Sequence, residues 1–213
     1  VINPSKMEMK NMEIPGDISK ASFLIAYACL STHSNLLFEN ILINPRRMGF
    51  IKTLNKMGAN ISIENKKNKY GEFIGNIHVK SNNRLKNIHV NDKDVRDIID
   101  EIPILSVVSA YSKGIMTITG LSELKLKESN RIIAIVSNLN SMGCDIREGR
   151  DSILIKGQKR LYNTSLNTFS DHRIAMSFYI ASLFAKHTPI LNESECIKVS
   201  FPDFFDKLGK IKI

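Results

Sequence analysis

The segment from residue 123 to residue 131 holds three basic and two acidic side chains, directly before a pattern typical of a helix. Lys127 and Arg131 are four residues apart, so a helix beginning near Glu128 would place both on one side of its first turn. Backbone N–H groups at a helix start also favour anions. The segment therefore suits a phosphate or carboxylate, with Glu128 as a charge-balancing or proton-transfer group. A solvated helix start is the alternative, since surface charge clusters are common.

An Asp precedes each of three strongly apolar segments, at Asp17, Asp100 and Asp171. Asp is a good helix N-cap, and the segments that follow are apolar on every side, so we expect three helices that are buried all round. Pro103 makes the second helix start rigid and so holds the Asp100 carboxylate in place. This carboxylate is either a plain cap or a catalytic group.

The third of these helix starts carries two further polar side chains. Asp171 is expected to cap the helix and His172 to fill space, whereas Arg173 at the helix start is expected to meet an anion. Arg46 and Arg131 each lie twelve residues before a glycine (58 − 46 and 143 − 131). We expect one of these two arginines to be functional and the other to be inherited scaffold.

An order of helix, strand, helix and strands occurs three times, over about residues 15–80, 98–157 and 169–213. The Asp caps recur at intervals of 83 (100 − 17) and 71 (171 − 100) residues, which suits one supersecondary unit each. The three apolar helices must lie inside, so the pattern predicts an α/β fold with sheets and amphipathic helices around them. In the first copy we expect a charged hairpin loop over residues 65–70.

The composition argues against several other classes of protein. The 213 residues have 43% hydrophobic residues, which is enough for a core, and the longest apolar run, residues 23–30, is too short to cross a membrane. Cys29, Cys144 and Cys196 lack metal or redox spacing, so we expect reduced core thiols, no metal site and a cytoplasmic location.

The net charge of +9 would suit a nucleic-acid-binding protein, yet the chain has no Trp and no basic stretch interleaved with aromatic residues. We therefore expect no nucleic-acid partner, although a non-catalytic anion- or RNA-binding domain is the alternative from another class. A positive field would also attract small anionic substrates. Motifs for nucleotide hydrolysis, hydride transfer, and metal or serine hydrolysis are missing from the sequence.

Six short motifs, in this order along the chain, resemble the signatures of the 3-phosphoshikimate 1-carboxyvinyltransferase family, also called EPSP synthases. They are PGDISKA (15–21), NPRR (44–47), DEIP (100–103), KESNR (127–131), DHRIAM (171–176) and SFPDFF (200–205). The resemblance implies an inside-out α/β domain, in which three repeats of buried helices are surrounded by small sheets. It covers only the second part of the family sequence. Residues 1–14 would then be a lead-in from a missing N-terminal domain, and residues 15–213 one domain.

The resemblance also implies an activity. Family members transfer the enolpyruvyl group of phosphoenolpyruvate to the 5-hydroxyl of shikimate 3-phosphate, releasing phosphate, in aromatic amino acid biosynthesis. They use no metal or organic cofactor, and we expect a cytoplasmic enzyme that is a monomer when full length, with no membrane partner. Since the active site of the family lies between two domains, this chain should not turn over alone.

The family's site residues map onto the motifs of this chain. Asp100 would take the proton of the attacking hydroxyl, and Glu128 would exchange a proton with the methylene carbon of phosphoenolpyruvate. Lys127, Arg131 and Arg173 would hold the phosphoenolpyruvate anion. Asp171 and His172 are further possible site residues.

The sequence departs from the family pattern at two places. Asn130 stands where the family usually has Asp, which removes a charge beside Arg131 and is expected to loosen its orientation. Val199 stands where some members have Lys. Lys198 is one residue earlier, so Lys198 is given no ligand role. A sister enzyme, UDP-N-acetylglucosamine enolpyruvyl transferase, is the alternative within the fold, but the KESNR and DHR motifs favour the shikimate enzyme.

Overall fold

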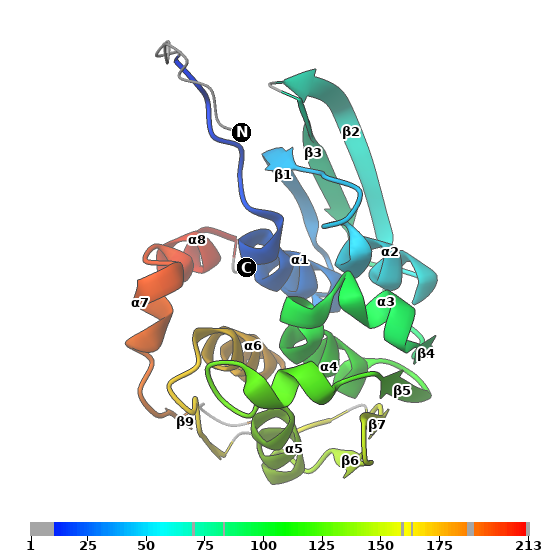
Figure 1. The fold of residues 1–213 in the computed structure, drawn as a ribbon. Coiled ribbons are helices and arrows are strands. Elements are labelled where there is room, and N and C mark those ends of the chain that lie inside the picture. The colour runs from blue at the N-terminus through cyan, green and yellow to red at the C-terminus, as the bar shows by residue number, and fades with distance from the viewer. Residues whose placement is uncertain are drawn as a thin grey trace, which may run out of the picture.

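The structure is a computed structural model that describes residues 11–69, 71–82, 84–158, 160–162, 164–186 and 190–211 (Figure 1). Residues 1–10 of the expected lead-in lie outside the described residues. The helices are α1 (Ile18–Leu30), α2 (Gly49–Lys56), α3 (Asp92–Arg96), α4 (Ile102–Tyr111), α5 (Arg131–Ser141), α6 (His172–Phe184), α7 (Cys196–Ser200) and α8 (Phe204–Ile211), with 3-10 turns η1 (Ile99–Glu101) and η2 (Ser122–Leu126). The strands are β1 (Asn35–Leu42), β2 (Asn60–Lys69), β3 (Glu72–Lys80), β4 (His89–Val90), β5 (Ile115–Thr119), β6 (Asp145–Glu148), β7 (Ser152–Lys156), β8 (Ser165–Leu166) and β9 (Ile190–Leu191).

Helices α1, α4 and α6 form the centre of the molecule and pack against one another (Figure 1). Most residues of the three are buried, as their all-round apolar sequences predict. The Tyr111 hydroxyl of α4 donates a hydrogen bond of 2.8 Å to the Ala181 carbonyl of α6. The ring of Phe23 in α1 meets the ring of Phe204 in α8 edge to face. The core therefore runs through the helices rather than through a central sheet.

Small sheets surround these helices (Figure 1). The first has the order β1-β3-β2 and is antiparallel throughout, with Phe38 and Ile63 both opposite Ile77. The second has the order β4-β5-β7-β6, and in it only the β4–β5 pair is parallel. The third is the short parallel pair of β8 and β9. This arrangement confirms the predicted α/β class, in which buried helices are surrounded by small sheets.

The charged hairpin loop that we expected over residues 65–70 is wrong for most of that range. Strand β2 continues to Lys69 and pairs with β3 beyond a bulge between Glu64 and Lys67. The Lys66 ammonium lies 4.3 Å from the centroid of the Phe73 ring, so a charged side chain helps to cover the apolar neighbour across the pair. Charges on an exposed strand edge are common, and they mimic a loop in the sequence.

The burial of the cysteines and the length of the helices bear on two expectations from the sequence. Cys29 and Cys144 are buried, whereas Cys196 is only half-buried, and burial raises the pKa of Cys29 to about 12. Within the described ranges, none of the helices is both long and apolar enough to cross a membrane.

Candidate active site

The starts of the three inner helices differ, because an Asp side chain caps α1 and α6 but not α4. The Asp17 carboxylate accepts a hydrogen bond of 2.8 Å from the Ser19 N–H, and the Asp171 carboxylate accepts bonds from Arg173 N–H and Ile174 N–H. Both residues are therefore N-caps, as predicted.

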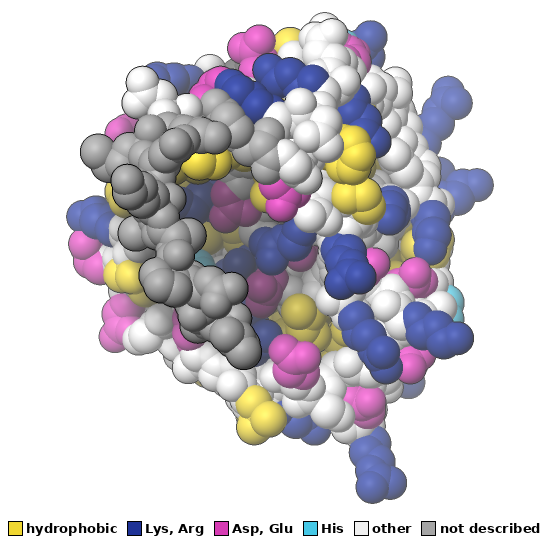
Figure 2. Space-filling view, turned by 45° about the horizontal axis from the view of Figure 1, so that its top comes forward, with side chains coloured by type: hydrophobic (Ala, Val, Ile, Leu, Met, Phe, Trp, Pro, Cys, Tyr) yellow, Lys and Arg dark blue, Asp and Glu magenta, His cyan; other side chains and the backbone are white. Residues whose placement is uncertain are grey.

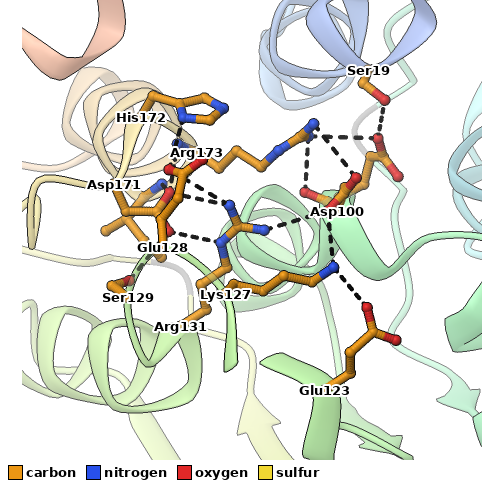
Figure 3. A network of polar contacts seen from close by, with 12 residues as sticks. Ser19, Asp100, Glu123, Lys127, Glu128, Ser129, Arg131, Asp171, His172 and Arg173 are labelled. Atoms are coloured by element: carbon orange, nitrogen blue, oxygen red, sulfur yellow. Dashed lines mark hydrogen bonds and ion pairs between the residues drawn. The ribbon is translucent and has the colours of Figure 1, made fainter. Parts of the chain in front are cut away.

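Asp100 does not cap α4, so the plain N-cap alternative for it is wrong. Asp100 lies within the single turn η1, which leads directly into α4, and the residue at the cap position is Glu101, whose side chain does not bond the helix N–H groups that the structure describes. This extra turn leaves the Asp100 carboxylate available to side chains from other helices (Figure 3).

The Asp100 carboxylate is surrounded by three cations. Its Oδ1 lies 3.8 Å from Lys127 Nζ and 3.4 Å from Arg131 Nη1. Its Oδ2 lies 3.6 Å from Arg173 Nη2, and Arg173 Nη1 also donates to the Asp100 backbone carbonyl at 3.1 Å. The Asp100 side chain is 33% exposed, so a ligand can reach it. Residues from three separate segments of the chain therefore meet at one carboxylate.

Helix α5 begins at Arg131 and not near Glu128 as expected. Asn130 is its N-cap and accepts a hydrogen bond of 3.2 Å from the Ile133 N–H, because Asn is a far better cap than Glu. Lys127 lies before the helix, directly after η2, and also pairs with Glu123 at 2.7 Å. The two cations meet because both reach Asp100, and not because they share a helix turn.

Arg131 and Asp171 form a buried ion pair. Arg131 Nε donates to Asp171 Oδ2 at 2.8 Å, and the side chain of Arg131 is only 3% exposed. The hydroxyl of Ser129 donates to the same carboxylate. Burial alone would raise the pKa of Asp171, but the hydrogen bond and charge of Arg131 outweigh it and hold that pKa below its usual value. The loosened orientation that we expected for Arg131 is therefore not observed.

Glu128 and His172 meet at the edge of this cluster. His172 Nδ1 lies 2.9 Å from Glu128 Oε2, and Arg131 Nη2 lies 4.0 Å from the same oxygen. Glu128 is 51% exposed, whereas His172 is largely covered. His172 therefore does more than fill space, because it holds a carboxylate that faces solvent.

A second network joins the helix starts from the other side, and the sequence interpretation missed it. Glu101 is buried, accepts a hydrogen bond of 2.5 Å from the Ser19 hydroxyl, and lies 3.8 Å from Arg173 Nη1. Burial raises the pKa of Glu101, and Ser19 and Arg173 offset only part of this effect. Arg47 Nη2 donates to the Ser19 hydroxyl at 2.7 Å. Arg46 and Arg47 are both exposed, and the arginine of this repeat that contacts Ser19 is Arg47.

Glu128, Asp171 and His172 have donor atoms that all lie within 4.8 Å of one another, the spacing of a metal site. The Asp171 oxygens, however, already accept from the Arg131 guanidinium and from two helix N–H groups. A guanidinium in this position would repel a metal ion. These residues fit an ion-pair network better than a metal centre.

The site lies on a hollowed surface. Figure 2 shows a hollowed face in which basic and acidic side chains lie side by side. A small cavity of about 80 Å³ adjoins the network and is lined by His172 and Arg173, among others. Since Lys127, Arg131 and Arg173 all face carboxylates, an anionic ligand would have to take over some of these ion pairs. The arrangement can bind an anion beside two accessible carboxylates, Asp100 and Glu128.

Comparison with known proteins supports the same conclusion. The sequence model of the family EPSP synthase (3-phosphoshikimate 1-carboxyvinyltransferase) matches residues 1–208. The chain belongs to this family. The 3-phosphoshikimate 1-carboxyvinyltransferase of Syntrophomonas wolfei is 40% identical over 212 residues, which cover 99% of this chain and 49% of that protein. The one from Persephonella marina is 37% identical over 206 residues, covering 97% and 48%.

Solved structures agree with the sequence comparison. EPSP synthase from Acinetobacter baumannii superposes with a TM-score of 0.90 at 33% identity, covering 98% of this chain and 48% of that chain. The enolpyruvyl transferase NikO from Streptomyces tendae has a TM-score of 0.70 at 14% identity, which shows a shared fold alone. These matches confirm the predicted family and inside-out fold class. The chain spans about half the length of the relatives that it matches.

Proposed function

We propose that this chain supplies the phosphoenolpyruvate-binding and proton-transfer half of an EPSP synthase active site. The reaction would join the enolpyruvyl group of phosphoenolpyruvate to the 5-hydroxyl of shikimate 3-phosphate and release phosphate. The observation that carries this proposal is the meeting of Lys127, Arg131 and Arg173 at Asp100, from three segments far apart in the sequence. Cations for a doubly anionic substrate thus lie beside a carboxylate that a ligand can reach.

Asp100 would act as the general base for the attacking hydroxyl. Its carboxylate would accept the hydroxyl proton while the oxygen attacks C2 of phosphoenolpyruvate, and Glu128 would donate a proton to C3, the methylene carbon. The product of this addition is a tetrahedral ketal that still carries the phosphate. Loss of phosphate and return of a C3 proton to Glu128 would then restore the double bond in the product. The exposure of both carboxylates supports these roles.

His172 and Asp171 would support the groups that contact substrate. His172 lies 2.9 Å from Glu128 and would hold its carboxylate in position for repeated proton transfer. Asp171 is fully buried and would fix the Arg131 guanidinium. Lys127, Arg131 and Arg173 would exchange their contacts with Asp100 for the carboxylate and phosphate of phosphoenolpyruvate, while Arg131 keeps its pair with Asp171.

The other half of the site would come from the part of the relatives that this chain does not span. Closure of two domains around the substrates excludes water, which strengthens every charge interaction inside. We therefore expect no EPSP formation by the 213-residue chain alone. The complete enzyme would be a cytoplasmic monomer that needs no metal or organic cofactor.

A complementation assay tests this proposal. The chain is mixed with the separately produced N-terminal half of the Syntrophomonas wolfei relative, and phosphate release from phosphoenolpyruvate is followed with shikimate 3-phosphate present. We expect release that disappears in Asp100→Ala and Glu128→Gln, and none when UDP-N-acetylglucosamine replaces shikimate 3-phosphate. A folded chain that gives no release, beside a half that works with its own partner, would refute the proposal.

A further inference from the structure

Lys20 opens onto the small cavity of about 80 Å³ beside the candidate site. The same cavity is lined by Arg173 and His172 from the start of α6 and by Ser200 from the end of α7. Two of these residues already belong to the candidate site. Lys20 therefore brings a further positive charge to that site from the first turn of α1.

The place of Lys20 in its helix is electrostatically unfavourable. α1 begins at Ile18 and is capped by Asp17, so Lys20 lies in the first turn. The helix dipole places partial positive charge there, and acidic residues are preferred at such positions. A lysine is easier to explain at this position if it meets an anion in the working protein.

No carboxylate in the described part of the chain forms an ion pair with Lys20. Its ammonium lies 5.7 Å from the centroid of the Phe201 ring. The nearby acid Asp203 is paired with Lys207 at 3.1 Å. In contrast to Lys127, Arg131 and Arg173, Lys20 need not give up a carboxylate when an anion arrives.

The opposite wall of the cavity provides no competing cation among the described residues. α7 contributes Ser200, but Lys198 pairs with Glu195 at 2.8 Å, and the Val199 side chain is 88% exposed. Positive charge at this end of the site thus comes from Lys20 and Arg173. A lysine ammonium binds phosphate as a compact point charge, and the planar arginine fork can bind either a phosphate or a carboxylate.

We propose that Lys20 is a further ligand of the anionic substrate and contacts the phosphate of phosphoenolpyruvate from the α1 side. The inference rests on the proposed function for the identity of the substrate. The anion-binding role rests on the cavity, the unpaired ammonium and the neighbouring Arg173.

Direct binding to the 213-residue chain tests this role without catalysis. Phosphoenolpyruvate and, separately, inorganic phosphate are titrated into wild type, Lys20→Ala, Lys20→Arg and Lys207→Ala while lysine side-chain NMR signals are recorded. Lys207 is the matched control, because its ammonium lies 5.8 Å from the same Phe201 ring but does not line the cavity. Since Lys207→Ala alone would leave Asp203 free to interact with Lys20, this control also carries Asp203→Asn. We expect Lys20→Ala to weaken phosphoenolpyruvate binding about tenfold, or about 1.4 kcal/mol, with Lys20→Arg and Lys207→Ala close to wild type.

Thermal stability separates this role from a structural one. Removing a cation from the first turn of α1 should leave the melting temperature of Lys20→Ala unchanged or raise it. Equal binding by wild type and Lys20→Ala would overturn the inference. If the chain alone binds phosphoenolpyruvate too weakly to measure, the KM for phosphoenolpyruvate in the complemented enzyme replaces the titration. There, Lys20→Ala should raise this KM and leave the KM for shikimate 3-phosphate unchanged, and an unchanged KM for phosphoenolpyruvate overturns the inference.

The outcomes also distinguish the two proposals. Lys20-dependent binding without enolpyruvyl transfer would refute the proposed function and keep the anion site. Enolpyruvyl transfer that does not depend on Lys20 would keep the proposed function and refute the role of Lys20 as a ligand of the anion. A wild-type chain that binds no phosphoenolpyruvate in either form would refute both.

Discussion

At the scale of single residues, the most deeply buried ion pair among the described residues joins Arg131 to Asp171. Arg131→Met removes the guanidinium but keeps an unbranched stem, so it leaves the Asp171 carboxylate buried and unpaired. We expect a loss of about 3–5 kcal/mol in the free energy of unfolding, measured by urea denaturation. Removing the exposed Lys198 of the Lys198–Glu195 pair is the control and should cost at most about 1 kcal/mol. Equal losses in both variants would contradict the importance of burial.

Two buried carboxyl groups of the site should respond to pH in opposite ways. The pKa of Asp171 is held low by Arg131, so its stabilising effect is present above its unfolded pKa of about 3.9 and is lost as the pH falls through the folded pKa. Burial raises the pKa of Glu101, so its effect is present below about pH 4.3 and is lost as the pH rises through the folded pKa.

Urea denaturation from about pH 3 to about pH 8 can test both signs. The stability advantage of wild type over Asp171→Asn should shrink toward acid pH. The advantage of wild type over Glu101→Gln should instead shrink toward neutral pH. Stability curves that run parallel to wild type at every pH would show that neither pKa is shifted.

Several site residues could be predicted from the sequence, because the chemistry of a short segment is local. Lys127, Glu128 and Arg131 stand together in the chain, and the structure brings Asp100 and Arg173 to them. The network of Ser19, Glu101 and Arg47 could not be read in the same way. Ser19 and Glu101 are 82 residues apart, and only the packing of α1 against α4 brings them together. Equal spacing to a glycine singled out Arg46 and Arg131 as alternatives and gave no signal for Arg47, the neighbour of Arg46 that makes the contact.

At the scale of elements, the sequence identified the three inner helices and α5 but not where α4 and α5 start, and it did not identify α3 or α7. Asp100 before an apolar run has the pattern of an N-cap, yet Asp100 lies in the turn η1, and α4 begins one residue later than that cap would place it, which releases the carboxylate. α5 starts at Arg131 because the Asn130 side chain is its N-cap and accepts a hydrogen bond from the Ile133 N–H. Both errors concern one turn of backbone, which local periodicity does not resolve. The three inner helices were clear because they are apolar on every face.

The cap of α5 gives a prediction at this scale. Asn130→Ala removes the acceptor for the Ile133 N–H and should lower the free energy of unfolding by about 1 kcal/mol, whereas Asn130→Asp should keep it within about 0.5 kcal/mol of wild type. Urea denaturation measures both. The Asp variant restores the usual residue of the family, so it also isolates the effect of charge at this position on Arg131. A larger loss in Asn130→Asp than in Asn130→Ala would mean that the added carboxylate disturbs the pairing of Arg131 with Asp171.

At the scale of the whole molecule, the three inner helices begin on the same side, and their starts form one wall of a site (Figures 1 and 3). Three cations of that wall, Lys127, Arg131 and Arg173, are paired with its own carboxylates. The chain covers about half of its relatives, so a facing wall would come from the other half in the complete fold. The resting ion pairs keep the charges satisfied while no substrate is bound, but they compete with substrate for the same cations.

This competition predicts that the two substrates bind cooperatively. A shikimate 3-phosphate hydroxyl at Asp100 would weaken the hold of this carboxylate on Lys127 and Arg173, and closure of the facing half would exclude water. Phosphoenolpyruvate affinity should therefore rise at least about tenfold when the complementary half and shikimate 3-phosphate are both present, which corresponds to a coupling of about 1.4 kcal/mol. Isothermal titration calorimetry measures this change, here and in the two further titrations below, in a Glu128→Gln background that is expected not to consume the substrates.

Two further titrations show which interactions produce the cooperativity. Shikimate 3-phosphate without the complementary half should leave the phosphoenolpyruvate affinity of this chain nearly unchanged, because the facing wall would hold that substrate in place. Asp100→Asn keeps the size of the side chain but frees the cations in advance, so it should raise the starting affinity and reduce the coupling. Coupling of the same size in Asp100→Asn and wild type would show that the ion pairs at Asp100 do not transmit it, and domain closure alone would then have to account for the effect.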